Sequence, residues 1–113
     1  MSAKGHASVV RAAKAFADPT RVRILALLRS GELCVCDLGD VLGVTQSTLS
    51  THLKVIRDAD LVTTRRAGKW IHYSLSAGGK ALAGSIARHF ADELAADPVV
   101  RRDATRAAKR CDC

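Results

Sequence analysis

The chain has 113 residues and a formal net charge of +7, because 18 Lys and Arg residues face 11 Asp and Glu residues. This length gives one domain at most, and the apolar share of 48% supplies a modest core, which excludes wholesale disorder. No run is long and apolar enough to cross a bilayer, and the first twenty residues lack a signal-peptide core, so we expect a cytoplasmic protein with no membrane partner. The positive charge favours a nucleic acid as partner.

Apolar residues at spacings of three and four predict four helices in the first half of the chain. Asp18 can cap the second helix, and Pro19 suits its first position, where a missing backbone N–H costs nothing. Gly43 ends the short third helix, and Thr45 caps the fourth. The predicted helices cover residues 6–17, 19–30, 35–42 and 46–59.

The second half of the chain changes from helical to alternating sequence. Two strands around a turn at Ala67-Gly68 predict a hairpin, and a long last helix ends at Asp97-Pro98. These strands and this helix cover residues 61–66, 69–75 and 79–96. The basic residues that follow favour a tail that is mobile without ligand, with a further short helix as the alternative.

The order of these elements predicts a winged helix-turn-helix, because a tight turn joins the third and fourth helices and a hairpin follows them. The expected fold class is therefore mainly α with a small β-hairpin. We divide the chain into a DNA-binding and dimerisation domain over residues 1–96 and a basic, cysteine-containing tail over residues 97–113.

The outer face of the fourth predicted helix carries short polar side chains, which suit base edges and phosphates. Alone, such a face is more often merely solvated, but a tight turn before it and a basic hairpin after it favour double-stranded DNA. His52 could equally pack against its neighbours. The candidate DNA-binding residues are Thr45, Gln46, Ser47, Thr48, Ser50, Thr51, His52, Lys54, Arg65, Arg66 and Lys69.

Four cysteines stand in two Cys-x-Cys pairs, which favour metal or metalloid binding in a chain without export signals. Both thiols of the first pair can grip one ion only if Cys34 precedes the regular helix, where the helix N-terminus stabilises thiolate. Buried, inert cysteines are the alternative for a single pair. The candidate metal ligands are Cys34, Cys36, Cys111 and Cys113. No nucleophile motif or phosphate loop supports an enzyme.

Together these features resemble the ArsR/SmtB family of metal-responsive bacterial repressors over about residues 8–95. The most specific matches are DPTR at 18–21, ELCVCDL at 32–38, QSTLSTHL at 46–53 and GKWIHY at 68–73. The resemblance implies a homodimer, held by the first and last helices, that leaves its operator when an ion binds. The candidate dimer-interface residues are Val9, Phe16, Leu82, Ile86, Phe90 and Leu94.

The arsenic sensors of this family resemble Glu-Leu-Cys-Val-Cys-Asp-Leu-Cys, and this chain has Gly39 in place of the third cysteine. The resemblance implies a repressor of an arsenical-resistance operon, with As(III) or Sb(III) as inducer and no permanently bound cofactor. We predict that Cys111 or Cys113, of the same or the partner subunit, supplies the third ligand. Cd(II), Pb(II) or Zn(II) held by four thiolates is the main alternative.

Two further functions stay open on the sequence. A redox-sensing repressor would bind DNA in the same way, and a cysteine of the first pair would form a disulfide with one of the second. A metal-buffering or thiol-transfer protein would use its basic surface for solubility alone.

Overall fold

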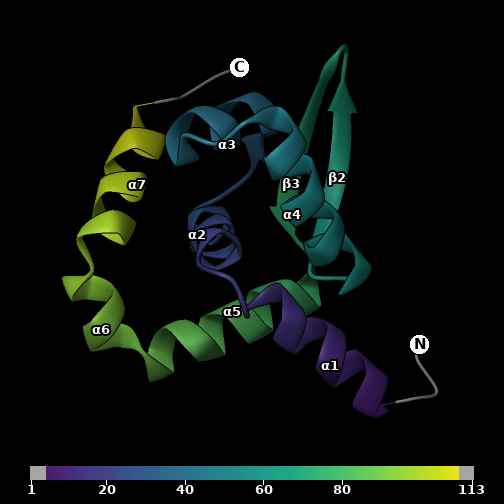
Figure 1. The fold of residues 1–113 in the computed structure, drawn as a ribbon, viewed down its shortest axis with the longest axis vertical. Helices are drawn as coiled ribbons and strands as arrows, with labels where there is room; N and C mark the ends of the chain where they lie inside the picture. The colour runs from purple at the N-terminus through teal and green to yellow at the C-terminus, as the bar shows by residue number, and fades with distance from the viewer. Residues whose placement is uncertain (1–4, 110–113) are drawn as a thin grey trace.

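The computed structural model describes residues 5–109, which form a mainly helical fold with a small three-stranded antiparallel sheet (Figure 1). The elements are α1 (Gly5–Ala15), α2 (Pro19–Leu28), β1 (Leu33–Cys34), α3 (Val35–Leu42), α4 (Gln46–Asp58), β2 (Val62–Ala67), β3 (Trp70–Leu75), α5 (Ala77–His89), α6 (Ala91–Ala96) and α7 (Pro98–Ala108). The expected winged helix-turn-helix order is confirmed. Within residues 5–109, no helix is long and apolar enough to span a membrane.

The core is aliphatic and is built around α2, which lies in the middle of the molecule with α3 on one side and α5 on the other (Figure 1). The buried side chains of α2 are Ile24, Leu25, Leu27 and Leu28. On α4, the predicted inner stripe of Leu49, Leu53 and Ile56 is buried. This stripe fixes which face of α4 turns outward, since residues three and four apart share one side of a helix.

The predicted helix boundaries arise from local hydrogen bonds. The carboxylate of Asp18 accepts from the backbone N–H of Thr20 at 2.8 Å and of Arg21 at 3.2 Å, which caps α2. The hydroxyl of Thr45 caps α4 by accepting from the N–H of Thr48 at 3.2 Å. Between α3 and α4, Gly43 adopts a φ of 70°, a left-handed conformation that favours glycine.

The sheet contains one strand more than the predicted hairpin. β2 and β3 pair from Val62 opposite Leu75 to Ala67 opposite Trp70, as the alternating sequence indicates. β1 adds two residues to the free edge of β3, with Cys34 opposite His72. A strand of two residues is too short to show alternation, so its pairing follows from the tertiary fold. It attaches the start of α3 directly to the hairpin.

The long last helix predicted over residues 79–96 is wrong, because the helix breaks at Phe90. There φ is −106° and ψ is 28°, and the chain turns from α5 into α6. The break separates the predicted apolar stripe: Leu82 packs against the core, whereas Phe90 is 44% exposed. The start of α5 lies tightly on the core, since a Cβ on Gly79 would lie 1.9 Å from the carbonyl oxygen of Leu61.

The tail expected to be mobile instead forms α7 over its described part, and α7 packs on α2 and α3. Its attachment is an ion pair: Nε and Nη2 of Arg23 donate to the two carboxylate oxygens of Asp103 at 2.7 and 2.9 Å. Asp103 is only 2% exposed. Figure 1 shows α5, α6 and α7 curving around α2. The expectation treated the charges of this segment as solvated, whereas the carboxylate of Asp103 is buried and paired with the partly buried Arg23.

Candidate thiol site and nucleic-acid interface

The first cysteine pair lies at the junction of β1 and α3. Cys34 has extended backbone angles, with φ −79° and ψ 158°, and its Sγ caps α3 by accepting from the N–H of Asp37 at 3.4 Å. Cys36 lies in the first turn of the helix. The predicted requirement, that Cys34 precede the regular helix, is therefore confirmed, and both sulfurs can face one another.

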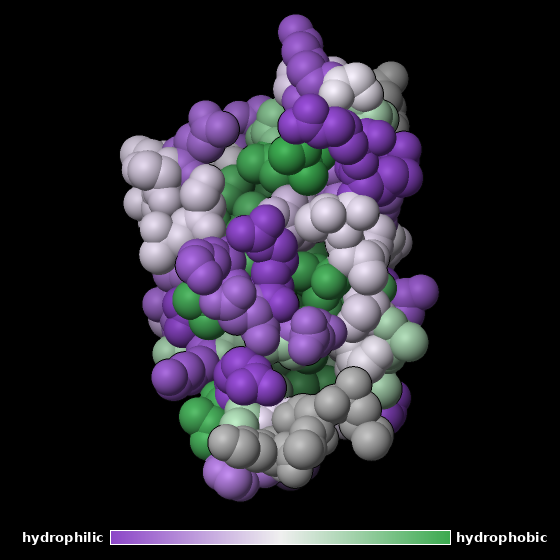
Figure 2. All heavy atoms as spheres, turned by 90° about the vertical axis from the view of Figure 1, so that its right-hand side faces the viewer, coloured by the Kyte–Doolittle hydropathy of each residue, from purple (hydrophilic) through white to green (hydrophobic). Residues whose placement is uncertain are grey.

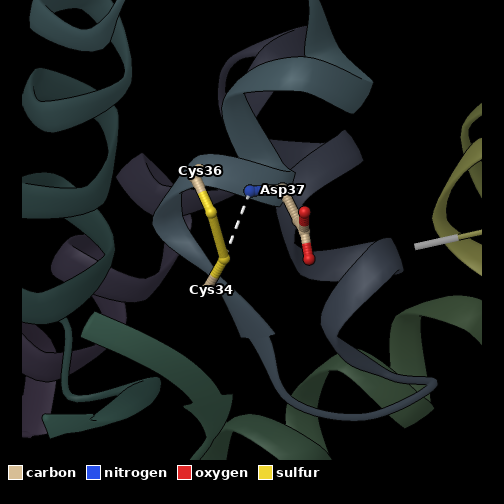
Figure 3. A group of neighbouring side chains, drawn as sticks. All are labelled: Cys34, Cys36 and Asp37. Carbon is tan, nitrogen blue, oxygen red and sulfur yellow. Dashed lines mark hydrogen bonds between the residues drawn. A yellow bond between two sulfur atoms is a disulfide. The ribbon is translucent and has the colours of Figure 1, made fainter. Parts of the chain in front are cut away.

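The structure joins Cys34 and Cys36 by a disulfide, with their Cα atoms 5.4 Å apart (Figure 3). A carboxylate oxygen of Asp37 and the two sulfurs all lie within 4.8 Å of one another. Cys34 is 1% exposed, Asp37 is 7% exposed and Cys36 is half-buried. In the reduced state this cluster offers two soft sulfur donors beside one hard oxygen donor, a set suited first to thiophilic ions.

Asp37 was not among the predicted ligands. The available signal was its position, because an acidic residue in the first turn of a helix lies near the helix N-terminus, where the sulfurs also lie. The predicted ligands Cys111 and Cys113 lie outside the described residues. The described chain ends next to α3: Nη1 of Arg106 donates to the carbonyl of Val41 at 3.4 Å. Lys109 shares a surface hollow with Asp40 and Val41.

The polar face of α4 is exposed along most of its length, as predicted. The exposed candidates at its cap and on its surface are Thr45, Gln46, Ser47, Thr48, Ser50, Thr51 and Lys54. Lys54 forms an ion pair with Asp58 one turn further on, at 2.9 Å. An exposed pair of this kind is weak and gives way readily to a stronger anion such as a phosphate.

His52 differs from the rest of the polar face, because it is half-buried against α2. Its Nδ1 lies 3.1 Å from Nη1 of Arg21 and 3.7 Å from the carboxylate of Asp18. The structure therefore agrees with the alternative in which His52 packs against its neighbours. Sequence periodicity alone did not indicate which residues these partners are. The contact connects the N-cap and first turn of α2 to the middle of α4.

The Asp18 carboxyl group is part of this contact. Partial burial raises its pKa, but the N–H of Arg21, the charge of His52 and the N–H of Thr20 together hold the pKa below its ordinary value near 3.8. Asp18 therefore carries a negative charge at neutral pH. The charged carboxylate therefore contacts both the start of α2 and the side of α4.

The basic residues of the hairpin fall into two groups. Arg65 lies in the middle of β2 and donates to both carboxylate oxygens of Glu32, at 2.6 and 3.1 Å. This hydrogen bond lowers the pKa of Glu32 and raises that of Arg65. Arg66 and Lys69 are exposed nearer the turn, and the Lys69 ammonium lies 5.3 Å from the ring centroid of Trp70. The tip thus presents cations, while Arg65 is already engaged.

A groove of about 570 Å³ connects the thiol site with this surface. Its walls come from α3, α4 and β3, and they include Cys36, Gly39, Ser50 and Trp70. Figure 2 views the side of the molecule that carries the hairpin, where hydrophilic side chains project and hydrophobic atoms are exposed between them. The lining of the groove is mixed: apolar side chains such as Leu53 lie beside charged ones such as Asp40 and Arg57.

The candidate dimer residues lie on α1, α5 and α6 or directly at the ends of these helices, and they are unevenly exposed. Val9 is 68% exposed and Phe90 is 44% exposed. Phe16 and Leu82 are partly buried against the core, and Ile86 and Leu94 are half-buried. Exposed apolar side chains of this size mark surfaces that a second chain can cover.

Comparison with known proteins gives a consistent assignment. The family model described as "Bacterial regulatory protein, arsR family" matches residues 18–64. The chain is 48% identical over 64 residues to the arsenical resistance operon repressor of Escherichia coli K12, an alignment that covers 56% of this chain and 55% of the repressor. The chain thus spans about half the length of this curated relative.

Solved structures resemble a larger part of the chain. HlyU from Vibrio cholerae superposes with a TM-score of 0.71 and 35% identity, covering 80% of this chain and 99% of HlyU. A homodimeric winged helix-turn-helix DNA-binding domain from Mycobacterium bovis gives a TM-score of 0.68 and 28% identity, covering 82% of this chain and 92% of that domain. These relatives are regulators of transcription rather than enzymes.

Proposed function

The chain belongs to the arsR family of bacterial regulatory proteins, and we propose that it is a dimeric, cytoplasmic repressor that trivalent arsenic releases from operator DNA. The observation that carries this proposal is the position of the Cys34 and Cys36 sulfurs, which meet at the first turn of α3. α3 is the first helix of the helix-turn-helix, and only Gly43, Val44 and Thr45 separate it from α4. A change at the sulfurs would therefore act on the helix that directly precedes α4, the helix that would read the DNA.

Ligand capture requires the reduced pair, since the thiolate is the form that binds. A thiol reductant first opens the Cys34–Cys36 disulfide and is itself oxidised to a disulfide. Arsenous acid then exchanges one hydroxyl for each cysteine sulfur and releases one water per exchange. The capped geometry at Cys34, where Sγ accepts from the N–H of Asp37, is the contact that a bound arsenic atom would replace or share.

The third sulfur comes, in our proposal, from Cys111 or Cys113. Cys111 follows Lys109 by two positions, a stretch that spans about 7 Å when extended. Lys109 adjoins Asp40, and Asp40 and Cys36 are four residues apart, so they lie on the same face of α3. This placement supports a third ligand from the same subunit.

For DNA, we propose that α4 reads the major groove and that the hairpin tip contacts the backbone. The exposed polar face of α4 and the exposed Arg66 and Lys69 support this arrangement. A dimer would bind two half-sites about one helical turn, roughly 10 bp, apart, with strong dependence on salt. The exposed Val9 and Phe90 support pairing through α1 and the α5–α6 region.

The decisive experiment is a titration of the reduced full chain on a duplex selected from a random pool, followed by fluorescence anisotropy. Arsenite and antimonite should release the DNA. The variant Cys34→Ser/Cys36→Ser should keep its DNA affinity within about twofold and lose release. Cys111→Ser/Cys113→Ser should weaken the arsenite response at least tenfold. Release by cadmium, lead or zinc at lower concentrations than arsenite would instead favour the four-thiolate alternative.

A second candidate, a redox-sensing repressor, is favoured by the disulfide between Cys34 and Cys36. Peroxide would oxidise the two thiols to a disulfide and yield two molecules of water. This pairing lies within the first cysteine pair rather than between the two pairs. If peroxide releases the DNA without any metal, and Cys111→Ser/Cys113→Ser leaves that release unchanged, the redox sensor is supported over the arsenic sensor.

A further inference from the structure

The exposed charged side chains of α7 and its C-terminal cap are all basic. They are Arg101, Arg102, Arg106 and Lys109. Residues three and four positions apart share one side of a helix, so Arg102, Arg106 and Lys109 lie on a single face. The acidic residue within Pro98–Ala108 is Asp103, and it is only 2% exposed. We call the surface formed by Arg102, Arg106 and Lys109 the α7 basic face.

The ion pair with α2 sets the direction in which this face points. The carboxylate of Asp103 accepts from Arg23 at 2.7 and 2.9 Å, and Ala107, one turn further on, packs against the core. Asp103 and Ala107 therefore form the inner side of α7. A helix that is merely solvated gains stability from acidic and basic residues four apart on its surface. The exposed side of α7 has no such pair, because its acidic residue faces inward and is already neutralised.

The α7 basic face lies beside the first helix of the helix-turn-helix. Nη1 of Arg106 donates to the carbonyl of Val41 at 3.4 Å, and Lys109 lines a surface hollow with Asp40 and Val41. α3 contacts both α7 and β3. In Figure 1 the end of α7, α3 and the turn of the hairpin lie toward the upper edge of the molecule, with α5 at the opposite edge. The α7 basic face and the hairpin tip thus lie on either side of α3.

This placement matches the geometry of a DNA duplex. A helix in the major groove, which is about 12 Å wide, has a phosphate backbone on each side. The first helix of a helix-turn-helix crosses the backbone while the second reads the bases. The hairpin tip offers Arg66 and Lys69 on one side, and the α7 basic face offers three cations on the other, beside the single carboxylate of Asp40. Guanidinium and ammonium groups are the usual protein partners of phosphate.

We propose that the α7 basic face is a further DNA contact, which binds backbone phosphates of the same duplex beside α3. This inference rests on the proposed function, because it requires α4 and the hairpin on that duplex. Phosphate contacts carry no sequence information directly. The α7 basic face would therefore add affinity and salt dependence, while the preferred operator sequence would stay the same.

The test measures DNA binding by the reduced full chain, the variant Arg102→Gln/Lys109→Gln and a control variant, Lys80→Gln/Arg88→Gln. The control removes the same two charges from exposed positions of α5, on the far side of α2 from α3 (Figure 1). Fluorescence anisotropy is recorded at several KCl concentrations. Each protein is titrated on a duplex selected from a random pool and on a random-sequence duplex of equal length.

The α7 variant should raise the dissociation constant by about tenfold or more on both duplexes, since it loses phosphate contacts in each subunit. The slope of log K against log salt should fall in magnitude by about 2, because each lost contact removes about 0.9 and a dimer has two copies of the face. The control should stay within about twofold of the parent chain, since its charges lie away from the proposed contact.

Two further measurements separate a charge effect from a structural one. Arg102→Lys/Lys109→Arg keeps both charges and should bind DNA as the parent chain does. Circular dichroism and sedimentation equilibrium should show the same helix content and the same dimer for every variant, because the substituted positions are exposed. If Arg102→Gln/Lys109→Gln fails to fold, the single variant Arg106→Gln replaces it and should show the same loss on both duplexes, by about threefold.

The outcomes distinguish this inference from the proposed function. Equal dissociation constants and salt slopes for the parent chain and the α7 variant would overturn the inference and leave the repressor proposal standing. A loss confined to the selected duplex would also overturn it, because that result would indicate base contacts. So would unchanged DNA binding with weaker binding to phosphatidylglycerol vesicles, which would assign the face to a lipid surface. A parent chain that shows no preference for any selected duplex would overturn the proposed function itself.

Discussion

The first and last described helices are attached to the molecule in opposite ways. α1 buries only Ala15 among its own residues, and its Val9 and Val10 are 68% and 50% exposed. Its C-terminal end is held by polar contacts, since Nη2 of Arg21 donates to the carbonyl of Lys14 at 2.7 Å. α7, by contrast, has a charged sequence and yet packs closely through the buried carboxylate of Asp103.

This difference shows that apolar content alone does not decide which helices are packed within a single chain. α1 leaves apolar area that a second chain can bury, so its full stabilisation should depend on protein concentration. α7 is completed within one chain by the Arg23 and Asp103 pair, so its stabilisation should not. The Asp103 carboxylate also raises the pKa of Arg23 further above its usual range.

The largest effect should follow from Asp103→Asn, which leaves Arg23 facing a neutral partner beneath α7. Loss of a largely buried charged hydrogen bond should lower the free energy of unfolding by about 2–3 kcal/mol. Hydrogen exchange should become faster in α7 and stay unchanged in α1. Asp92→Asn, the same change at an exposed position of α6, is the control and should have little effect. Equal stability of the two variants would contradict the assigned role of the pair.

The next effect tests the other side of the comparison, with Val9→Ser on α1. Because Val9 is largely exposed within one chain, the stability of the monomer should change by less than about 0.5 kcal/mol. The dissociation constant of the dimer should rise about tenfold, which corresponds to about 1.4 kcal/mol. Analytical ultracentrifugation measures this constant, with exposed Ala104→Ser on α7 as the control. An unchanged constant would remove α1 from the dimer interface.

A smaller effect is expected from Asp18→Ala at the start of α2, the helix that supports both α1 and α7. Loss of this helix cap should cost about 1 kcal/mol at neutral pH. The folded pKa of Asp18 lies below its ordinary value near 3.8, so the charged carboxylate stabilises the fold above that value. That contribution is lost as the pH falls through the lowered folded pKa.

Urea unfolding at pH 7 and at about pH 3 measures this difference. The gap between Asp18→Ala and the parent chain should narrow at the lower pH. Asp92→Ala, at an exposed position, should show no such narrowing. A gap that stays constant between the two pH values would show that the charge of Asp18 contributes nothing to the cap.

The smallest effect should come from Arg106→Gln, also on α7. Its contact with the carbonyl of Val41 is 3.4 Å long, and the residue is exposed, so the loss should stay within about 0.5 kcal/mol. Thermal unfolding monitored by circular dichroism gives the comparison with Asp103→Asn. A loss as large as that of Asp103→Asn would mean that the basic residues of α7 share the attachment equally.

The elements that could be predicted from the sequence are those with local causes. The caps at Asp18 and Thr45, the left-handed Gly43 and the inner stripe of α4 all depend on residues within one or two turns. The exposure of the polar face of α4 follows from the same periodicity. The position of Cys34 before the helix was also accessible, because two cysteines two residues apart cannot converge within a regular helix.

The features that could not be predicted depend on partners far away in the chain. β1 forms because Leu33 and Cys34 pair with the edge of β3, and α7 is attached because Asp103 forms an ion pair with Arg23. Likewise, the contact of His52 with Arg21 joins residues 31 positions apart. No local pattern encodes such pairs. The break at Phe90 similarly interrupts a stripe whose spacing continues through it.

The Arg23 and Asp103 pair joins residues 80 positions apart, which has a consequence for how the molecule is made. Contacts of such long range close late, because the intervening chain must be ordered first. During synthesis, the helix-turn-helix and the hairpin, which end at Leu75, leave the ribosome before Asp103 does. The residues of α4 and the hairpin that would meet DNA therefore emerge before the acidic partner of Arg23. A nascent or truncated chain that stops short of Asp103 would hold the helix-turn-helix and the hairpin while Arg23 still lacks its carboxylate partner.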